Sequence, residues 1–184
     1  MNGGGSRLPD LRGGWAWLVW AAAIILLLAL SREDSTSAQE ATLLCNGGFE
    51  ATTAGAPDCW TAASGTAQSV LTPVHSGARA AALTTTSSRE AQLNQVVPVS
   101  PGALYRFAGF AVKNDGNLSE VTLRISWYSG ADGTGTRLSV VQSLEVLTDD
   151  SPSFRLLSTG DVAAPIGAQS ARMGAAARPY SATP

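Results

Sequence analysis

The segment from Glu120 to Tyr128 constrains the fold most strongly, because apolar and polar residues alternate along it. The apolar members are Val121, Leu123, Ile125 and Trp127, and the polar members are Thr122, Arg124, Ser126 and Tyr128. Successive side chains of a strand point to opposite faces of its sheet, so this period predicts a β-strand with one face in the core and one in water. We expect Trp127 to be buried and Tyr128 to lie on the outer face.

Weaker strand-like runs recur along the chain, and no apolar stripe with helical spacing is visible after Gln39. The further expected strands are Ser69–Val74, Ala80–Thr85, Gln92–Val99, Ala103–Val112, Leu138–Leu147 and Phe154–Ser158. Clusters of Gly, Pro, Asn and Asp separate them. Short strands divided in this way predict an all-β fold, an antiparallel β-sandwich, rather than alternating βαβ units. The aromatic residues in or beside these runs are expected in the core: Trp60, Tyr105, Phe107, Trp127 and Phe154.

The N-terminal part contains an uncharged apolar segment, Gly13 to Ser31, between Arg12 and Arg32. We expect it to form one hydrophobic helix after residues 1–12, which stay cytoplasmic, and before a linker at 32–42. Small residues at Thr36-Ser37-Ala38 would suit a cleaved signal peptide. At about 1.5 Å per residue the segment would also just cross a hydrocarbon layer of about 30 Å as a single membrane anchor. Both alternatives place the rest of the chain outside the cytoplasm, secreted or anchored.

The two cysteines of the chain, Cys45 and Cys59, are expected to form a disulfide. Oxidising conditions outside the cytoplasm allow cysteines to pair. Closing a loop of this length stabilises a fold by about 3 kcal/mol in the chain-entropy model. Two cysteines and the single His75 supply too few ligands for a structural zinc site.

Composition and motifs exclude several classes of function. The formal charge is −2, from 12 basic and 14 acidic residues, so the chain lacks the basic footprint of a nucleic-acid-binding protein. The only histidine is His75, and no Gly-x-Ser-x-Gly motif accompanies it. The adjacent carboxylates Asp149 and Asp150 lie in an expected loop, where we expect solvation rather than glycoside cleavage. The sequence therefore favours a protein that is not an enzyme.

Four short stretches, in this order, carry a resemblance to a known family. They are Asn46-Gly47-Gly48-Phe49-Glu50 with Trp60, His75-Ser76-Gly77 with Ala80-Ala81-Ala82-Leu83, Leu93 to Val99 with Pro101-Gly102 and Tyr105, and Phe154 with Ala171-Arg172-Met173. Their succession resembles that of carbohydrate-binding modules of families four, nine and twenty-two, which are jelly rolls of the galactose-binding-like superfamily. The resemblance implies a β-sandwich module over residues 43–178, a tail at 179–184, and a polysaccharide or glycan as partner.

The resemblance also raises a structural calcium ion. It implies Glu50 as a metal ligand, helped by backbone oxygens near Ser76 to Ala78. In the family, a last strand with two aspartates helps to bind this ion and closes the sandwich, and no such pair follows Arg178 here. We therefore expect a module whose last strand is missing. A solvated Glu50 is the other interpretation, because calcium prefers six to eight oxygen ligands.

The candidate sugar-binding surface follows from the outer face of the strand at Glu120–Tyr128. Sugar sites combine aromatic faces with a few polar side chains on a rigid sheet. The candidates are Tyr128, Arg124, Ser126 and Thr122 on this strand, Gln92 and Asn94 on the strand at Gln92–Val99, and Phe110. The alternative function is a cell-surface structural or protein-interaction module. In that case the open edge would exchange or add a strand with a partner chain.

Overall fold

The computed structural model describes residues 42–180, which form strands, turns and one short 3₁₀ helix, η1 (Ala131–Gly133). The hydrophobic helix expected at 13–31 lies outside the described residues. Between Thr42 and Tyr180 no helix has the length and apolar character needed to cross a bilayer. The expected all-β class is confirmed for this part of the chain.

A five-stranded antiparallel sheet forms one layer. Its strand order is β10 (Arg137–Gln142), β9 (Leu118–Tyr128), β13 (Ser170–Pro179), β6 (Ala91–Pro98) and β3 (Thr61–Ser64). β9 contains the alternating segment from which a strand was predicted. β13, which lies at the centre of the sheet, was not among the strands expected from the sequence.

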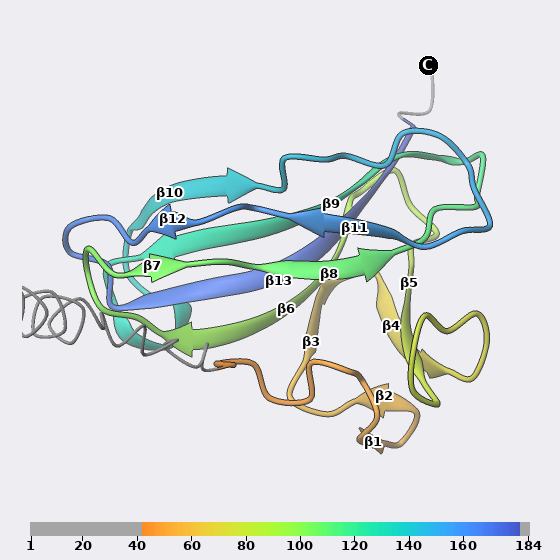
Figure 1. Cartoon of the computed structure of the whole chain (residues 1–184), viewed down its shortest axis with the longest axis horizontal. Helices are drawn as coiled ribbons and strands as arrows, with labels where there is room; N and C mark the ends of the chain where they lie inside the picture. The colour runs from red at the N-terminus through yellow and green to blue at the C-terminus, as the bar shows by residue number, and fades with distance from the viewer. Residues whose placement is uncertain (1–41, 181–184) are drawn as a thin grey trace, which may run out of the picture. The chain divides into compact units, whose positions relative to one another are not determined.

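Short antiparallel pairs form the rest of the described fold. They are β7 (Leu104–Tyr105) with β12 (Val162–Ala163), β8 (Ala108–Ala111) with β11 (Arg155–Ser158), β4 (Thr66–Val70) with β5 (Ala80–Thr84), and β1 (Thr52–Thr53) with β2 (Ala56–Pro57). Figure 1 shows β7, β8, β11 and β12 running across the front of the five-stranded sheet. The arrangement is consistent with a β-sandwich.

The core lies between these two layers. Ile125 and Trp127 of β9 are fully buried, and they belong to one cluster with Met173 of β13, Phe107 and Leu157. The alternation predicted for β9 is therefore confirmed, with Trp127 inward. Among the other aromatic residues expected in the core, Trp60 and Tyr105 are partly buried against the cluster. Phe154 is half-buried and makes an edge contact with His75 instead.

Two expected strands are shorter than predicted, because side-chain hydroxyls replace backbone partners. The run Ala103–Val112 divides into β7 and β8, and between them the Phe107 amide donates to Oγ1 of Thr159. The run Leu138–Leu147 ends as β10 at Gln142. At the next residue the Ser143 hydroxyl accepts the Leu123 amide and donates to the Glu145 carbonyl. The expected strand at Ser69–Val74 lies earlier, as β4.

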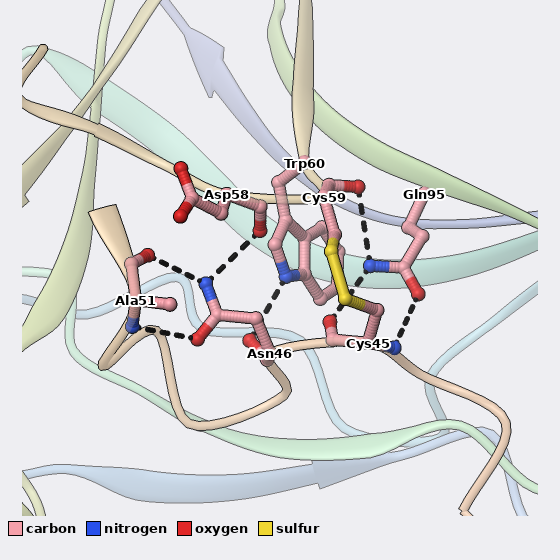
Figure 2. Close-up of a disulfide and its surroundings, with 7 residues drawn as sticks. All are labelled: Cys45, Asn46, Ala51, Asp58, Cys59, Trp60 and Gln95. Carbon is pink, nitrogen blue, oxygen red and sulfur yellow. Dashed lines mark hydrogen bonds between the residues drawn. A yellow bond between two sulfur atoms is a disulfide. The ribbon is translucent and has the colours of Figure 1, made fainter. Parts of the chain in front are cut away.

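The predicted disulfide between Cys45 and Cys59 is confirmed, and Figure 2 shows the polar contacts that surround it. Gln95, on the core side of β6, accepts the Cys45 amide and donates to the carbonyls of both cysteines. Asn46, at a positive φ of 51°, holds the following turn: its side chain donates to the carbonyls of Ala51 and Asp58. The disulfide corner is thus tied to the main sheet through one buried amide.

Asp149 and Asp150 are both exposed, as expected for a loop, and Asp150 makes one further contact. Its carboxylate forms an ion pair with Lys113, which is only 3% exposed. A buried ammonium group needs a charged partner because its desolvation is costly. Asp150 therefore supports the fold by neutralising the buried charge of Lys113.

Candidate functional site

The outer face of the five-stranded sheet brings most of the predicted site residues together. Strand register sets Gly174 of β13 opposite both Arg124 of β9 and Asn94 of β6. The neighbouring rows set Ser126 opposite Arg172, and Ala176 opposite both Thr122 and Gln92. A depression of about 100 Å³ lies here, and the predicted residues that line it are Gln92, Asn94, Arg124, Ser126 and Tyr128. We call this depression the groove.

Thr122 lies on the same face but is buried at 1% exposure and does not line the groove. It pairs with Ala176 across β9 and β13. Thr122 thus lies on the predicted face of the sheet. Because it is buried, it would not contact a ligand directly.

Gly174 forms the floor of the groove. A Cβ atom at this position would lie 2.0 Å from Oδ1 of Asn94 and 2.8 Å from the carbonyl oxygen of Leu93. Any side chain here would therefore displace Asn94 and press on the backbone of β6. A glycine inside a strand often marks such a close approach. Gly174 indicates a close approach only once a strand is recognised at Ser170–Pro179, and that strand was not expected from the sequence.

An ion pair closes one end of the groove. The Arg124 guanidinium binds Glu90 in a two-pronged arrangement, Nη1 to Oε1 at 2.5 Å and Nη2 to Oε2 at 2.7 Å, and Gln92 Nε2 donates to Oε1 at 2.7 Å. Arg178 lies 3.5 Å from Glu90 and also pairs with Glu120. Burial acts to raise the pKa of Glu90, but the hydrogen bonds from Arg124 and Gln92 and the nearby positive charges outweigh it. The pKa of Glu90 therefore lies below its ordinary value of 4.5.

The other end of the groove combines an aromatic ring with positive charge. The guanidinium carbon of Arg172 lies 5.1 Å from the centre of the Tyr128 ring, which is a cation–π contact. Arg137 and Val140 of β10 line the same end. Among the described residues neither Arg172 nor Arg137 takes part in an ion pair. This end therefore carries uncompensated positive charge.

Two buried donors at the groove have no partner in the described part of the chain. They are Nδ2 of Asn94 and Nε of Arg124. Buried polar groups in folded proteins are nearly always hydrogen-bonded, and each exception calls for an explanation. Both atoms belong to residues that line the groove, so an acceptor bound there would satisfy them.

Sequence reasoning missed three charged residues of this face: Glu90, Arg137 and Arg172. Arg172 had been quoted only as part of the family resemblance. Glu90 is 34 residues from Arg124 in the chain, and only the pairing of β6 and β9 with β13 brings the two near each other. No local pattern indicates that contact.

Phe110 does not lie on this face, and its assignment there is a wrong prediction. It belongs to β8, in the second layer, and is 51% exposed. Its ring stacks on His75 at 3.6 Å between ring centres. The neighbouring Gly109 faces the core, since a Cβ there would lie 3.8 Å from Leu123. The alternation of residues along the strand correctly predicted that Phe110 points outward, but it does not indicate the layer to which the strand belongs.

Glu50 lies beside the turn at Ser76–Ala78, where the resemblance implied a calcium ligand. Glu50 is exposed, and both of its carboxylate oxygens accept the backbone amide of Ala78, at 3.1 and 3.2 Å. The carboxylate thus faces an N–H group where the prediction placed backbone oxygens. Within residues 42–180, no three His, Cys, Asp or Glu side chains gather in a way that would hold a metal ion.

Comparison with known proteins gives one curated relative. Exochitinase 1 of Streptomyces olivaceoviridis is 33% identical over 139 residues, which cover 76% of this chain and 20% of the exochitinase. The chain thus corresponds to about a fifth of that relative's length. No family model matches the chain.

Two solved structures resemble the fold. The enzymatically active domain of bacteriophage CBA120 tailspike protein 4 has a TM-score of 0.57 and 13% identity, covering 76% of this chain and 19% of the other. The C-terminal family 22 carbohydrate-binding module of Clostridium thermocellum Xyn10B has a TM-score of 0.50 and 19% identity, covering 73% and 87%.

The fold is similar to that of the family 22 carbohydrate-binding module, as the sequence resemblance implied. The match covers most of the described residues and most of the family 22 module, so it concerns the whole domain rather than a shared hairpin.

Proposed function

We propose that this domain binds carbohydrate along the outer face of its five-stranded sheet and has no catalytic activity of its own. The observation that carries the proposal is the groove itself. It joins the Tyr128 ring to several polar side chains on paired strands, and it includes a buried amide donor of Asn94 without a partner. Aromatic surface with a few well-placed polar groups is what a sugar ring requires.

The comparisons support a carbohydrate-binding function. The solved family 22 structure is described as concerning residues in the cleft of that module in ligand binding. The curated relative is an exochitinase, an enzyme that acts on chitin, and this chain matches only 20% of it. We propose that the matching part is an accessory module, a jelly roll that holds a polysaccharide while a separate domain cleaves it.

The depth of the groove suggests the shape of the ligand. Its volume of about 100 Å³ is well below the roughly 300–1,000 Å³ of pockets that enclose small molecules. A ligand bound here would insert a substituent or one edge of a ring, while the rest lies along the sheet. A polymer offers such an extended contact.

The disulfide supports an extracytoplasmic location. Bridges of this kind persist in oxidising compartments and are rare in the cytosol. We propose that the domain is exported, either secreted or held at the membrane by the segment at 13–31.

The experiment is a pull-down of the exported domain with insoluble chitin, xylan and cellulose, followed by titration calorimetry with soluble fragments. Tyr128→Ala should abolish retention while the unfolding midpoint stays close to that of the parent. Phe110→Ala is the matched control, because it removes an exposed aromatic ring from the other layer. Equal loss in both variants, or retention by Tyr128→Ala, would refute the site.

A second candidate function has one specific observation in its favour. An apolar cavity of about 500 Å³ is lined by residues of β5 and β8, and each of these strands has only one paired neighbour among the described residues. Open strand edges can accept a strand from another chain. Dimerisation that depends on protein concentration, together with no binding to any saccharide, would favour this protein-interaction function instead.

A further inference from the structure

We infer that the groove recognises a saccharide that carries a carboxylate, such as a uronate unit, in preference to a neutral sugar. This inference rests on the proposed function and names its ligand class. It starts from the distribution of charge along the groove, which differs between its two ends.

At one end the charges are compensated. Arg124 and Arg178 face Glu90 and Glu120, two cations against two anions. The side chains of Arg124 and Glu90 are 18% and 16% exposed, so this ion pair is largely shielded from solvent. A ligand gains no net charge attraction there.

At the other end the charges are not compensated. Arg172 and Arg137 line the groove, and neither forms an ion pair among residues 42–180. Asp132 in the nearby η1 pairs with neither of them. The whole chain has a formal charge of −2, so this positive end is a local feature and not a general polyanion surface.

The buried groups without a partner also favour a ligand that accepts hydrogen bonds. Both buried nitrogen atoms without a partner at the groove, Asn94 Nδ2 and Arg124 Nε, are donors. A neutral sugar hydroxyl both donates and accepts, whereas a carboxylate only accepts and offers two oxygens. Guanidinium groups match the planar carboxylate in geometry as well as in charge.

The Tyr128 ring fixes where the anion would sit. Arg172 lies over this ring, so a sugar ring that stacks on the same face would displace the guanidinium to the side of the ring. A uronate ring seated against Tyr128 would direct its carboxylate to the guanidinium. Arg172 then acts as the residue that selects charge, while Tyr128 supplies the surface for any ring.

The test compares an oligogalacturonate of defined length with its methyl ester in titration calorimetry on the full chain. The two ligands share one backbone, and the ester replaces the charge of each carboxylate with a methyl group. We expect the acid to bind at least about tenfold more tightly, because its carboxylates form charge-assisted hydrogen bonds that the ester lacks. Added salt should reduce the difference by screening. Equal affinity for the two ligands would overturn the inference.

Two variants separate a specific site from general attraction. Arg172→Gln should weaken binding of the acid about tenfold and leave the methyl ester unchanged, whereas Arg155→Gln should change neither. Arg155 is exposed on β11 in the other layer, so its replacement alters net charge equally. Equal effects of the two variants, or equally tight binding of dextran sulfate, would show a nonspecific charge effect and refute the inference.

Failure of the inference and failure of the proposed function give different results. Binding of chitin or xylan fragments that is lost in Tyr128→Ala, without preference for the acid, would refute the carboxylate preference and keep the carbohydrate site. Absence of binding to every saccharide, acidic or neutral, would refute both.

Discussion

Replacing Gly174 with alanine tests the close approach on which the groove depends. The added Cβ would lie 2.0 Å from Asn94 Oδ1, the end of a movable side chain, and 2.8 Å from the Leu93 carbonyl, which belongs to the backbone of β6. Overpacking of this kind costs about 1–3 kcal/mol. Removing a glycine from the unfolded chain returns about 0.4–1 kcal/mol. We therefore expect a net loss of roughly 1–2 kcal/mol in the free energy of unfolding.

Thermal and urea unfolding, followed by circular dichroism, would measure this loss. For a domain of this size it corresponds to a fall in Tm of roughly 3–7 °C. Gly109→Ala is the matched control, because Gly109 also lies in a strand and a Cβ there would meet only Leu123 at an ordinary 3.8 Å. It should be neutral or slightly stabilising.

A double-mutant cycle divides the cost between its two sources. In the Asn94→Ala background the Oδ1 contact is gone, while the Leu93 carbonyl remains 2.8 Å from the new Cβ. The cost of Gly174→Ala should therefore fall by at least about 0.5 kcal/mol without vanishing. A Gly174→Ala variant as stable as Gly109→Ala would show that the strands do not approach as closely as described.

Three further perturbations test the fold around the groove. Replacing Cys45 and Cys59 with serine should lower the free energy of unfolding by about 3 kcal/mol in a urea titration, and an unchanged midpoint would argue against the loop-entropy account. Trp127→Ala should cost about 3–5 kcal/mol, because its side chain is fully buried, and a cost below about 1 kcal/mol would place it outside the core. The pKa of Glu90 is lowered on folding, so its stabilising contribution is complete above the unfolded value near 4.5 and is lost as the pH falls through the folded value. Stability measured against pH should therefore decline less steeply below pH 4.5 in Glu90→Gln, and identical slopes in parent and variant would contradict this.

The part of the fold that could be predicted from the sequence is the part governed by strict alternation. In β9 the inward side is apolar and mostly buried, and the outward side is polar and mostly half-buried, so its two faces follow from residue type alone. Its neighbour β13 escaped prediction because alanine and glycine are depleted in strands and show little periodicity. β13 is a strand because β6 and β9 pair with it on both sides, which is a tertiary effect.

The same difference explains which site residues were found. Tyr128, Arg124 and Ser126 share one face of β9, and Gln92 and Asn94 share one face of β6, so strand parity found them once both strands were expected. Arg172 and Gly174 lie on the unexpected β13 and were missed as site residues. Phe110 was misplaced because parity gives direction within a sheet and not the sheet to which a strand belongs.

The arginines at the two ends of the groove are held differently. Arg124 is fixed by two hydrogen bonds to Glu90, and its loss would leave a shielded carboxylate with weaker partners, so it supports the sheet as well as the groove. Within residues 42–180, the Arg172 guanidinium makes a cation–π contact with Tyr128 and no ion pair, and such a contact contributes about 0.5–1 kcal/mol at exposed sites. It can therefore turn toward a bound anion at little cost to the fold. Under the proposed carboxylate preference, selectivity depends on the arginine that contributes less to stability, so that preference could be changed by mutation while the sheet stays intact.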